Sequence, residues 1–237
     1  MKMFKLKKTG LIFTALLVST SACTSIKSGS GNIKKVKSID IQVIPYYSAL
    51  GGKVEWVNVY NEIDPLLASN RFTDYQKAVE IVEKDPALVT PITMFTLAAR
   101  SYDFGKRDDA VKWFYRGRDR LITALYVLNL PKMSEVEYVD FSKLVGSVIN
   151  PYAFCDFAKQ EKAAEEAVKW VKANPYQAIF YEKIPSKYSD RKKALKESEA
   201  ELDKRLIRQK NYLSNSKHKQ EFLQQREKNQ VQQRFCW

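Results

Sequence analysis

The sequence feature that most constrains the fold is a helical pattern that begins after Asp64-Pro65 and continues almost to the C-terminus. Apolar residues recur in it at spacings of three and four, which is typical of amphipathic helices. Capping residues and prolines divide the pattern at Thr90-Pro91, Asn150-Pro151 and Asn174-Pro175. We therefore expect a mostly α-helical fold. The expected helices are Pro65–Ser69, Thr73–Glu83, Pro91–Phe104, Asp108–Leu128, Ser134–Ser147, Pro151–Ala173, Tyr176–Lys183 and one long charged helix over Ser189–Gln233.

Further local signals bear on the path of the chain. Thr73 is expected to cap the helix that follows it, and Gly105 to end a helix in the left-handed conformation. Before the helical region, Val36–Ile44 and Val54–Tyr60 have partly alternating apolar residues, with Gly51-Gly52 between them. These two stretches indicate a short N-terminal extended or β segment, which can pair as a hairpin.

Small residues are spaced along the helical region in a way that lets two helices approach closely. The clearest unit has them at Leu97-Ala98, Gly105, Ala110 and Gly117. This arrangement resembles a tetratricopeptide repeat, and Ala78 and Ala163 mark weaker copies at intervals of 32 and 53 residues. The resemblance implies antiparallel helical hairpins, over roughly residues 65–175, that present a groove to a protein or peptide. Small residues at such spacings are also common in ordinary helix packing, so both interpretations stay open.

The N-terminus has the organisation of a secretory signal peptide. Lysines precede a short apolar run, Leu11–Val18, and small residues follow it. Thr20-Ser21-Ala22-Cys23 resembles the lipobox of bacterial lipoproteins, which implies that residues 1–22 are removed and that Cys23 carries the lipid. Thr24 then implies sorting to the outer membrane, with the protein facing the periplasm. The alternatives are an ordinary cleavage after Ala22 without lipid and an uncleaved anchor.

Composition divides the rest of the chain into three parts. Residues 23–35 are expected to form a flexible tether, residues 36–183 a mainly helical globular domain, and residues 184–237 a basic, largely helical tail. Residues 183–237 hold 15 Lys and Arg against 7 Asp and Glu, whereas residues 23–182 hold 21 against 20. In an exported protein, such charge favours lipid headgroups, cell-wall polymers or acidic proteins as neighbours, and argues against nucleic acid.

The tail has only a thin apolar stripe among its charged residues. It can therefore be a long helix lying on the domain, half of a coiled coil that awaits a partner, or a frayed charged segment. Asn215-Ser216 is its expected weak point.

Two cysteines remain besides Cys23, namely Cys155 and Cys236. In an oxidising compartment they can form a disulfide, which would hold the end of the tail against the globular domain. Cys155 lies beside Phe154 and near Phe157, so it is also interpreted as a buried free thiol.

The chain is poor in residues typical of catalysis. Its one histidine, His218, lies between two lysines and is interpreted as a solvent-exposed spectator. A single histidine is too few for a metal site built from several histidines, and it leaves one candidate base for a Ser-His-Asp triad. No glycine-rich phosphate loop precedes a helix. Acidic residues are plentiful enough for a glycosidase, but nothing marks a catalytic pair. We therefore expect no catalytic residues, no metal site and no cofactor.

The densest cluster of aromatic and charged residues is Lys112–Arg120. On a helix, Trp113, Arg116 and Arg120 share one face, because they are three and four residues apart. Aromatic and arginine side chains are enriched in interaction hot spots, so these three are candidates for binding a partner. The alternative places Trp113 and Phe114 in the core, has Gly117 permit a close helix contact, and pairs the arginines with Asp103, Asp108 or Asp109.

Together these features favour a non-enzymatic envelope lipoprotein that acts as a protein-binding module. The specific hypothesis is an immunity protein against a periplasmic toxin, since the chain combines an anchor with a lack of catalytic residues. The alternative is an envelope scaffold or assembly factor that contacts the cell wall or a membrane complex through the basic tail. A wall or lipid hydrolase is a third class, without a marked carboxylate pair. The expected partners are the membrane, through the lipid on Cys23, and an unidentified toxin or envelope protein.

Overall fold

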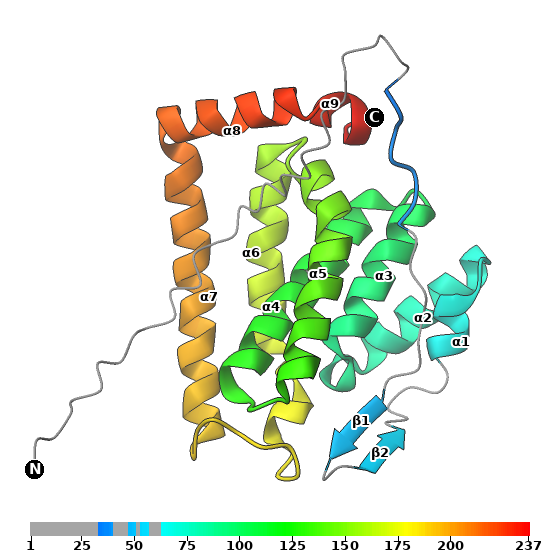
Figure 1. Ribbon diagram of the computed structural model, residues 1–237, viewed down its shortest axis with the longest axis vertical. Helices are drawn as coiled ribbons and strands as arrows, with labels where there is room; N and C mark the ends of the chain where they lie inside the picture. Colours follow the sequence, from blue (N-terminus) through cyan, green and yellow to red (C-terminus); the bar gives the residue numbers. More distant parts are fainter. Residues whose placement is uncertain (1–32, 40–46, 51–52, 57–62) are drawn as a thin grey trace, which may run out of the picture. The chain divides into compact units, whose positions relative to one another are not determined.

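Helices dominate the part of the chain that the computed structural model describes, which is residues 33–39, 47–50, 53–56 and 63–237 (Figure 1). The α-helices are α1 (Ile63–Ala68), α2 (Phe72–Lys84), α3 (Pro91–Asp103), α4 (Arg107–Val127), α5 (Lys132–Ala153), α6 (Phe157–Ala173), α7 (Arg191–Ser214), α8 (Ser216–Lys228) and α9 (Val231–Phe235). Two short 3-10 helices are η1 (Pro86–Leu88) and η2 (Gln177–Phe180). The predicted mostly α-helical fold is therefore confirmed.

The described N-terminal residues contain one antiparallel strand pair, β1 (Tyr47–Leu50) and β2 (Lys53–Trp56), with Tyr47 opposite Trp56. The predicted segment Val36–Ile44 is only partly described. Its residues up to Ile39 have no regular secondary structure. Cys23 and the predicted signal peptide lie outside the described residues. Within the described part, none of the helices is both long enough and apolar enough to cross a membrane.

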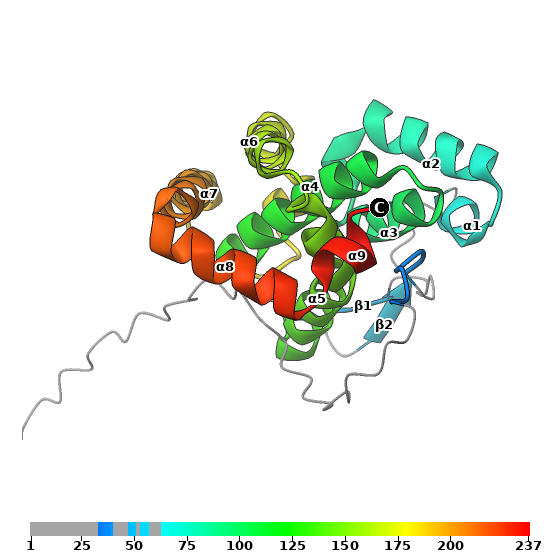
Figure 2. The same cartoon turned by 90° about the horizontal axis from the view of Figure 1, so that it is seen from above.

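Helix α4 is the central helix and packs against α3, α5, α6 and α7 (Figure 2). Its sequence explains this position, because Trp113, Phe114 and Tyr115 are consecutive and all buried. Successive residues of an α-helix point about 100° apart. A run of buried aromatic residues therefore requires neighbours on several sides of the helix.

Two glycines let neighbouring helices approach α4 closely. A Cβ atom at Gly117 would lie 2.9 Å from the Met94 Cβ on α3, and one at Gly146 on α5 would lie 2.7 Å from the ring of Phe114. Both separations are too short for carbon atoms in a packed interior, so a side chain at either position would push the helices apart. Gly105, in the turn between α3 and α4, has a φ of 71°, as predicted for a left-handed helix end.

The two predicted threonine caps have different outcomes. Thr90 caps α3, because its side-chain oxygen accepts a hydrogen bond from the Thr93 N–H at 3.1 Å. The prediction for Thr73 is wrong, because α2 begins at Phe72 and its N-cap residue is Arg71.

The predicted helix break at Asn150-Pro151 is also wrong. Helix α5 continues through Pro151 to Ala153, and α6 begins only at Phe157. Pro151 lies in the last turn of α5, where its missing N–H removes a single helical hydrogen bond. The cap of α6 comes from Asp156, whose carboxylate accepts a hydrogen bond from the Lys159 N–H at 3.0 Å.

The predicted helix over Tyr176–Lys183 is replaced by the short 3-10 helix η2 and a turn. Arg191 of α7 donates hydrogen bonds to three backbone carbonyls of this region, those of Ile179, Tyr181 and Ile184. A buried carbonyl needs a donor but not necessarily a helical one. Because one guanidinium supplies these donors, the segment is held in place without an α-helix.

The predicted single helix over Ser189–Gln233 is divided into α7, α8 and α9. The first break falls at the expected weak point, Asn215. Its side-chain oxygen accepts hydrogen bonds from the N–H groups of Lys217 and His218 at 3.0 and 3.2 Å, and thereby caps α8. Capping of a new helix is what turns the chain here.

Helix α7 is not a separate tail. It packs on α4 and buries Leu195 and Leu202, and residues 33–237 form one compact unit. The predicted boundary between residues 183 and 184 therefore marks a change in composition and not the edge of a domain. Residues 33–35, predicted as the end of the tether, belong to the same unit.

Candidate partner-binding groove

The predicted partner-binding residues Trp113, Arg116 and Arg120 do share one face of α4, but two of them are buried. Trp113 and Arg120 each have a relative exposure of 0%. Arg120 donates hydrogen bonds to the carbonyls of Val89 at 2.8 Å, Pro86 at 2.5 Å and Asn174 at 2.7 Å. A buried guanidinium needs such acceptors to replace water. The prediction that Trp113 and Arg120 contact a partner is therefore wrong, because both hold the core together.

Arg116 is the member of this trio that reaches the surface. Its guanidinium lies 5.1 Å from the ring centre of Trp113 and 4.6 Å from that of Trp170 on α6. The side chain is half-buried, and burial lowers its pKa. Among the described residues it forms no salt bridge, so the predicted pairing with an aspartate is not found. Arg116 instead contributes a cation between two tryptophan rings.

A groove of about 570 Å³ lies between α6 and α7 and reaches the first turn of α8. It differs from the predicted surface on α4. Its lining residues are Phe157, Gln160, Glu161, Ala164 and Glu165 from α6, Asp203, Leu206, Ile207, Gln209, Lys210, Leu213 and Ser214 from α7, and Lys219 from α8.

The floor of the groove is held by three amide and hydroxyl side chains in series. The buried Gln160 donates from Nε2 to the Tyr115 Oη on α4 at 3.0 Å. Its Oε1 accepts a hydrogen bond from the Gln209 Nε2 on α7 at 2.9 Å. Burial raises the pKa of Tyr115, so its hydroxyl stays neutral. This series fixes the spacing between α6 and α7, so the groove exists before any partner binds.

Charged residues line the edges of the groove, and apolar residues lie between them. Lys210 pairs with Glu161 across the two helices at 2.6 Å, and this hydrogen bond raises the pKa of Lys210. Asp203 pairs with Lys172 at 2.5 Å. Between them on α7, Ile207 is 58% exposed. An aliphatic side chain exposed this far at the mouth of a groove is a potential contact for a partner.

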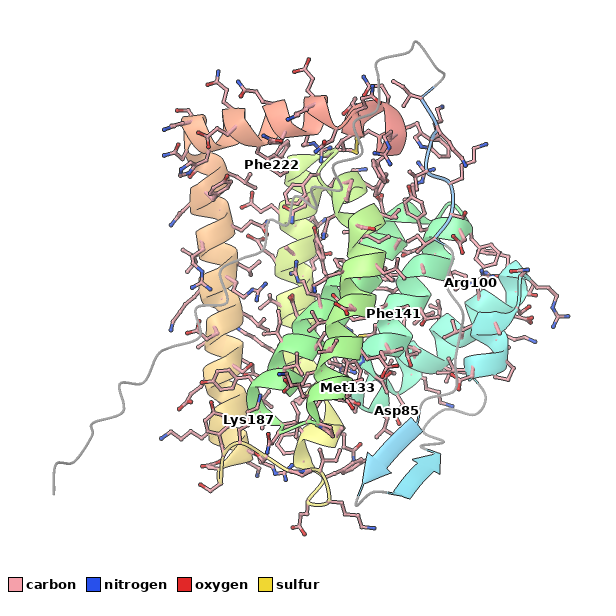
Figure 3. All side chains as sticks on the ribbon, viewed as in Figure 1. Asp85, Arg100, Met133, Phe141, Lys187 and Phe222 are labelled. Carbon is pink, nitrogen blue, oxygen red and sulfur yellow. A yellow bond between two sulfur atoms is a disulfide. The ribbon has the colours of Figure 1, made fainter. Side chains whose placement is uncertain are left out.

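Ring stacking holds the corner between α7 and α8, next to one end of the groove. The rings of Tyr212 and His218 stack at 4.5 Å across the corner between α7 and α8. Phe222 of α8 lies 5.2 Å from Phe154 and 5.9 Å from Phe157, which hold it against the start of α6 (Figure 3). His218, predicted to be an exposed spectator, therefore has a structural contact that fixes the direction of α8.

A disulfide between Cys155 and Cys236 ties the C-terminus to the turn between α5 and α6, with the two Cα atoms 5.6 Å apart. Arg226 of α8 lies 3.8 and 3.6 Å from the two sulfur atoms, and also donates to the Pro151 carbonyl at 3.2 Å. Helices α8 and α9 are therefore anchored at the corner with α7 and at the disulfide.

Within the described residues, no group of three or more His, Cys, Asp or Glu side chains is arranged to hold a metal ion. The groove combines apolar side chains, two neutral amides and acids and bases on its edges. Sequence reasoning missed these residues, although Ile207 and Leu213 on a highly charged helix were a signal, since neither is needed for the stripe that faces α4.

Comparison with known proteins identifies a relative of this chain. No protein-family model and no solved structure matches it. A Haemophilus influenzae protein described as uncharacterized is 51% identical over 231 residues, which span 98% of this chain and 88% of the relative. An identity this high over nearly the whole chain means that the two proteins share their fold. The chain therefore belongs to the same family as this Haemophilus influenzae protein.

Proposed function

We propose that this protein is a non-enzymatic envelope lipoprotein, anchored by a lipid on Cys23, that binds a partner protein in the groove between α6 and α7. The groove itself carries the proposal. It is open to solvent and has a hydrogen-bonded floor, and its edges offer both signs of charge around an exposed aliphatic residue. A preformed site of this kind loses little conformational entropy when it binds.

The lining favours an amphipathic segment of the partner, such as one helix or a loop with an apolar anchor. Apolar side chains from both helices, such as Phe157 and Leu206, would contact the apolar face of that segment. The acidic Glu165 and the basic Lys219, from different helices, would select its charged residues and its direction.

The partner that we favour is a periplasmic toxin, which makes this protein an immunity protein of the outer membrane. An inhibitor must hold its target tightly without transforming it, and a rigid groove with a mixed rim suits that task. The biological test is survival of a deletion strain in co-culture with toxin-bearing siblings. Undiminished survival of the deletion strain would refute this form of the proposal.

A photo-crosslinking amino acid at Ile207 tests the groove directly. The matched control carries the same amino acid at Leu144 of α5, which is 49% exposed and does not line the groove. We expect one protein to crosslink at position 207 and not at position 144 in intact cells. The purified partner should then bind the wild-type protein and lose at least tenfold in affinity for Ile207→Asp, because a charge would enter an apolar contact. Equal crosslinking at both positions would refute groove binding.

The second candidate is an envelope scaffold that works through its basic end. The observation that favours it is that α8 and α9 expose several cationic side chains and are fixed to the rest of the protein at both ends. Truncation after Lys183 cannot test this, because it would remove the buried Leu195 and Leu202 of α7. Charge substitutions on α8 are the suitable perturbation, and they should leave the crosslink at Ile207 unchanged if the groove is the working site.

We also propose that α3 and α4 form a degenerate tetratricopeptide unit. Three observations support the resemblance to a tetratricopeptide unit. Ala98 and Ala110 are buried, and Gly117 lets α3 approach α4 closely. Gly105 makes the tight turn between the two helices. The groove between α6 and α7 lies outside this pair. A solved structure of another family member with two such pairs stacked in one direction would support it, and unrelated packing would refute it.

A further inference from the structure

The point at which the tether joins the described unit is fixed beside the C-terminus. The Val36 N–H donates a hydrogen bond to the Arg234 carbonyl at 3.0 Å, and the Tyr102 hydroxyl donates to the Val36 carbonyl at 3.0 Å. The Ile39 N–H donates to the Asp103 carboxylate at 2.9 Å, and its side chain is buried. Residues 36–39 are therefore held against α3 and α9 (Figure 1).

The C-terminal residue is held at the same place. Arg107 stacks on the ring of Trp237 at 3.8 Å and donates a hydrogen bond to its carbonyl oxygen. The Lys35 ammonium lies 4.9 Å from the centre of the same ring, and the Trp237 Nε1 donates to the Arg234 carbonyl. Even so, Trp237 is 42% exposed. A tryptophan fixed in this way, with part of its ring in solvent, is typical of a contact with a surface that is partly apolar.

The surface around Trp237, which we call the basic end, consists of residues 33–37, α8, α9 and the C-terminus. Besides Lys219, which lines the groove, its exposed cationic side chains are Lys34, Lys35, Lys37, Lys217, Lys228 and Arg234, and its acidic ones are Glu221 and Glu227. Beside Trp237, two bases and two acids, Lys106, Arg107, Asp108 and Asp109, line a shallow cleft and balance one another in charge. Ile33 and Leu223 are also exposed here. Exposed aliphatic residues and tryptophan among lysines make up the composition of a membrane-surface contact.

We propose that the basic end lies on anionic phospholipid headgroups, so that the protein has one preferred orientation on its membrane. This inference rests on the proposed anchor at Cys23 for its place in the cell. Only nine residues, 24–32, separate Cys23 from Ile33. Fully extended, they span at most about 32 Å. A lipid on Cys23 would therefore hold the basic end close to the headgroups, at a high effective concentration.

The proposed orientation on the membrane also determines which way the groove faces. Helix α7 meets α8 at Asn215, and the groove is lined by the last three turns of α7 before this corner. If α8 lies on the headgroups, the α8 end of the groove faces the membrane and a partner enters from the side or from the periplasm. The groove that we propose to bind the partner would therefore have one fixed orientation relative to the membrane.

Vesicle binding by the chain without lipid tests this proposal. Residues 33–237 form one compact unit, so the chain from residue 23 with Cys23→Ser contains the whole of it. The probe is vesicles that contain phosphatidylglycerol, compared with vesicles of pure phosphatidylcholine. We expect sedimentation with the anionic vesicles alone, and weaker binding as the salt concentration rises.

Two matched pairs of charge substitutions distinguish vesicle binding through the basic end from binding caused by the net positive charge of the whole protein. Lys34→Gln with Lys37→Gln removes two exposed lysines that form no hydrogen bond or salt bridge with other described residues. At about 1 kcal/mol for each lysine near an anionic surface, the pair should weaken partitioning about 30-fold. The control, Lys192→Gln with Lys193→Gln, makes the same change in net charge at the other end of α7 and should change it less than about threefold.

Trp237 supplies a second readout. Brominated phosphatidylglycerol should quench part of the tryptophan fluorescence of the wild-type chain, and Trp237→Phe should abolish that quenching while the far-ultraviolet circular dichroism stays unchanged. Binding that both lysine pairs weaken equally, quenching that survives Trp237→Phe, or binding to purified cell wall without binding to vesicles would overturn the proposal. Ile207→Asp should not alter vesicle binding, so failure of the groove and failure of the membrane contact are distinguishable.

Discussion

Replacement of Arg120 by methionine distinguishes a core residue from a partner contact. Methionine keeps most of the aliphatic length of the side chain but offers no donor to the carbonyls of Pro86, Val89 and Asn174. Each hydrogen bond from a charged donor stabilises a fold by about 1.5–3 kcal/mol. Because the variant also no longer buries a charge, part of this loss is offset. We expect Arg120→Met to lower the free energy of unfolding by about 3–5 kcal/mol.

Arg116→Met is the matched control, one helical turn away on the same face of α4. It removes only two cation–π contacts, with the rings of Trp113 and Trp170. At about 0.5–1 kcal/mol for each, the expected loss is about 1–2 kcal/mol. Urea unfolding of the lipid-free chain, followed by tryptophan fluorescence, measures both variants. Equal stability of the two variants would refute the assignment of Arg120 to the core and would favour Arg120 as a contact for a partner.

Three further predictions concern packing, covalent linkage and ionisation. Gly146→Ala places a methyl group against the ring of Phe114 and should destabilise the protein by about 1–3 kcal/mol in the same urea assay. Cys155→Ala with Cys236→Ala opens a link between residues 81 apart. It should lower the free energy of unfolding by about 2–4 kcal/mol, with the fastest new amide exchange in α8 and α9. Burial raises the pKa of Tyr152 to about 12 from 10.0, so its contribution to stability is complete below pH 10 and is lost as the pH rises through 12. The pKa of Tyr126 is also raised to about 12, so in an alkaline absorbance titration Tyr152→Phe should reduce the step near pH 12 by one of these two tyrosines.

Where sequence reasoning succeeded, the signal was local. Thr90 before Pro91 caps α3, and Gly105 ends it in the left-handed conformation. Both outcomes depend on atoms within a few residues of each other, so a short window of sequence contains the whole cause. The same holds for Asn215, where a capping side chain divides the predicted tail helix.

Where it failed, the deciding partner was distant along the chain. Proline at position 151 is a helix breaker by local rules, yet α5 continues through it to Ala153, which is buried. Arg120 looked like a surface hot spot because its acceptors are backbone carbonyls 31, 34 and 54 residues away, and carbonyls leave no mark in a sequence. The groove escaped notice for the same reason, since its floor joins side chains that are 45 and 49 residues apart.

The composition of the last 54 residues suggested an appendage, but the packing of α7 links the two surfaces that we propose to be functional. One side of α7 buries Leu202 against Val168 and Val171 of α6 and Ile122 of α4, while Ile207 on another side borders the groove. The corner at Asn215 then joins α7 to α8, which carries part of the basic end. Because this corner is capped, ring-stacked and tied back through the disulfide, the groove and the basic end belong to one rigid element. A membrane contact through α8 would therefore fix the direction in which the groove faces, while the lining of the groove stays the same with or without that contact.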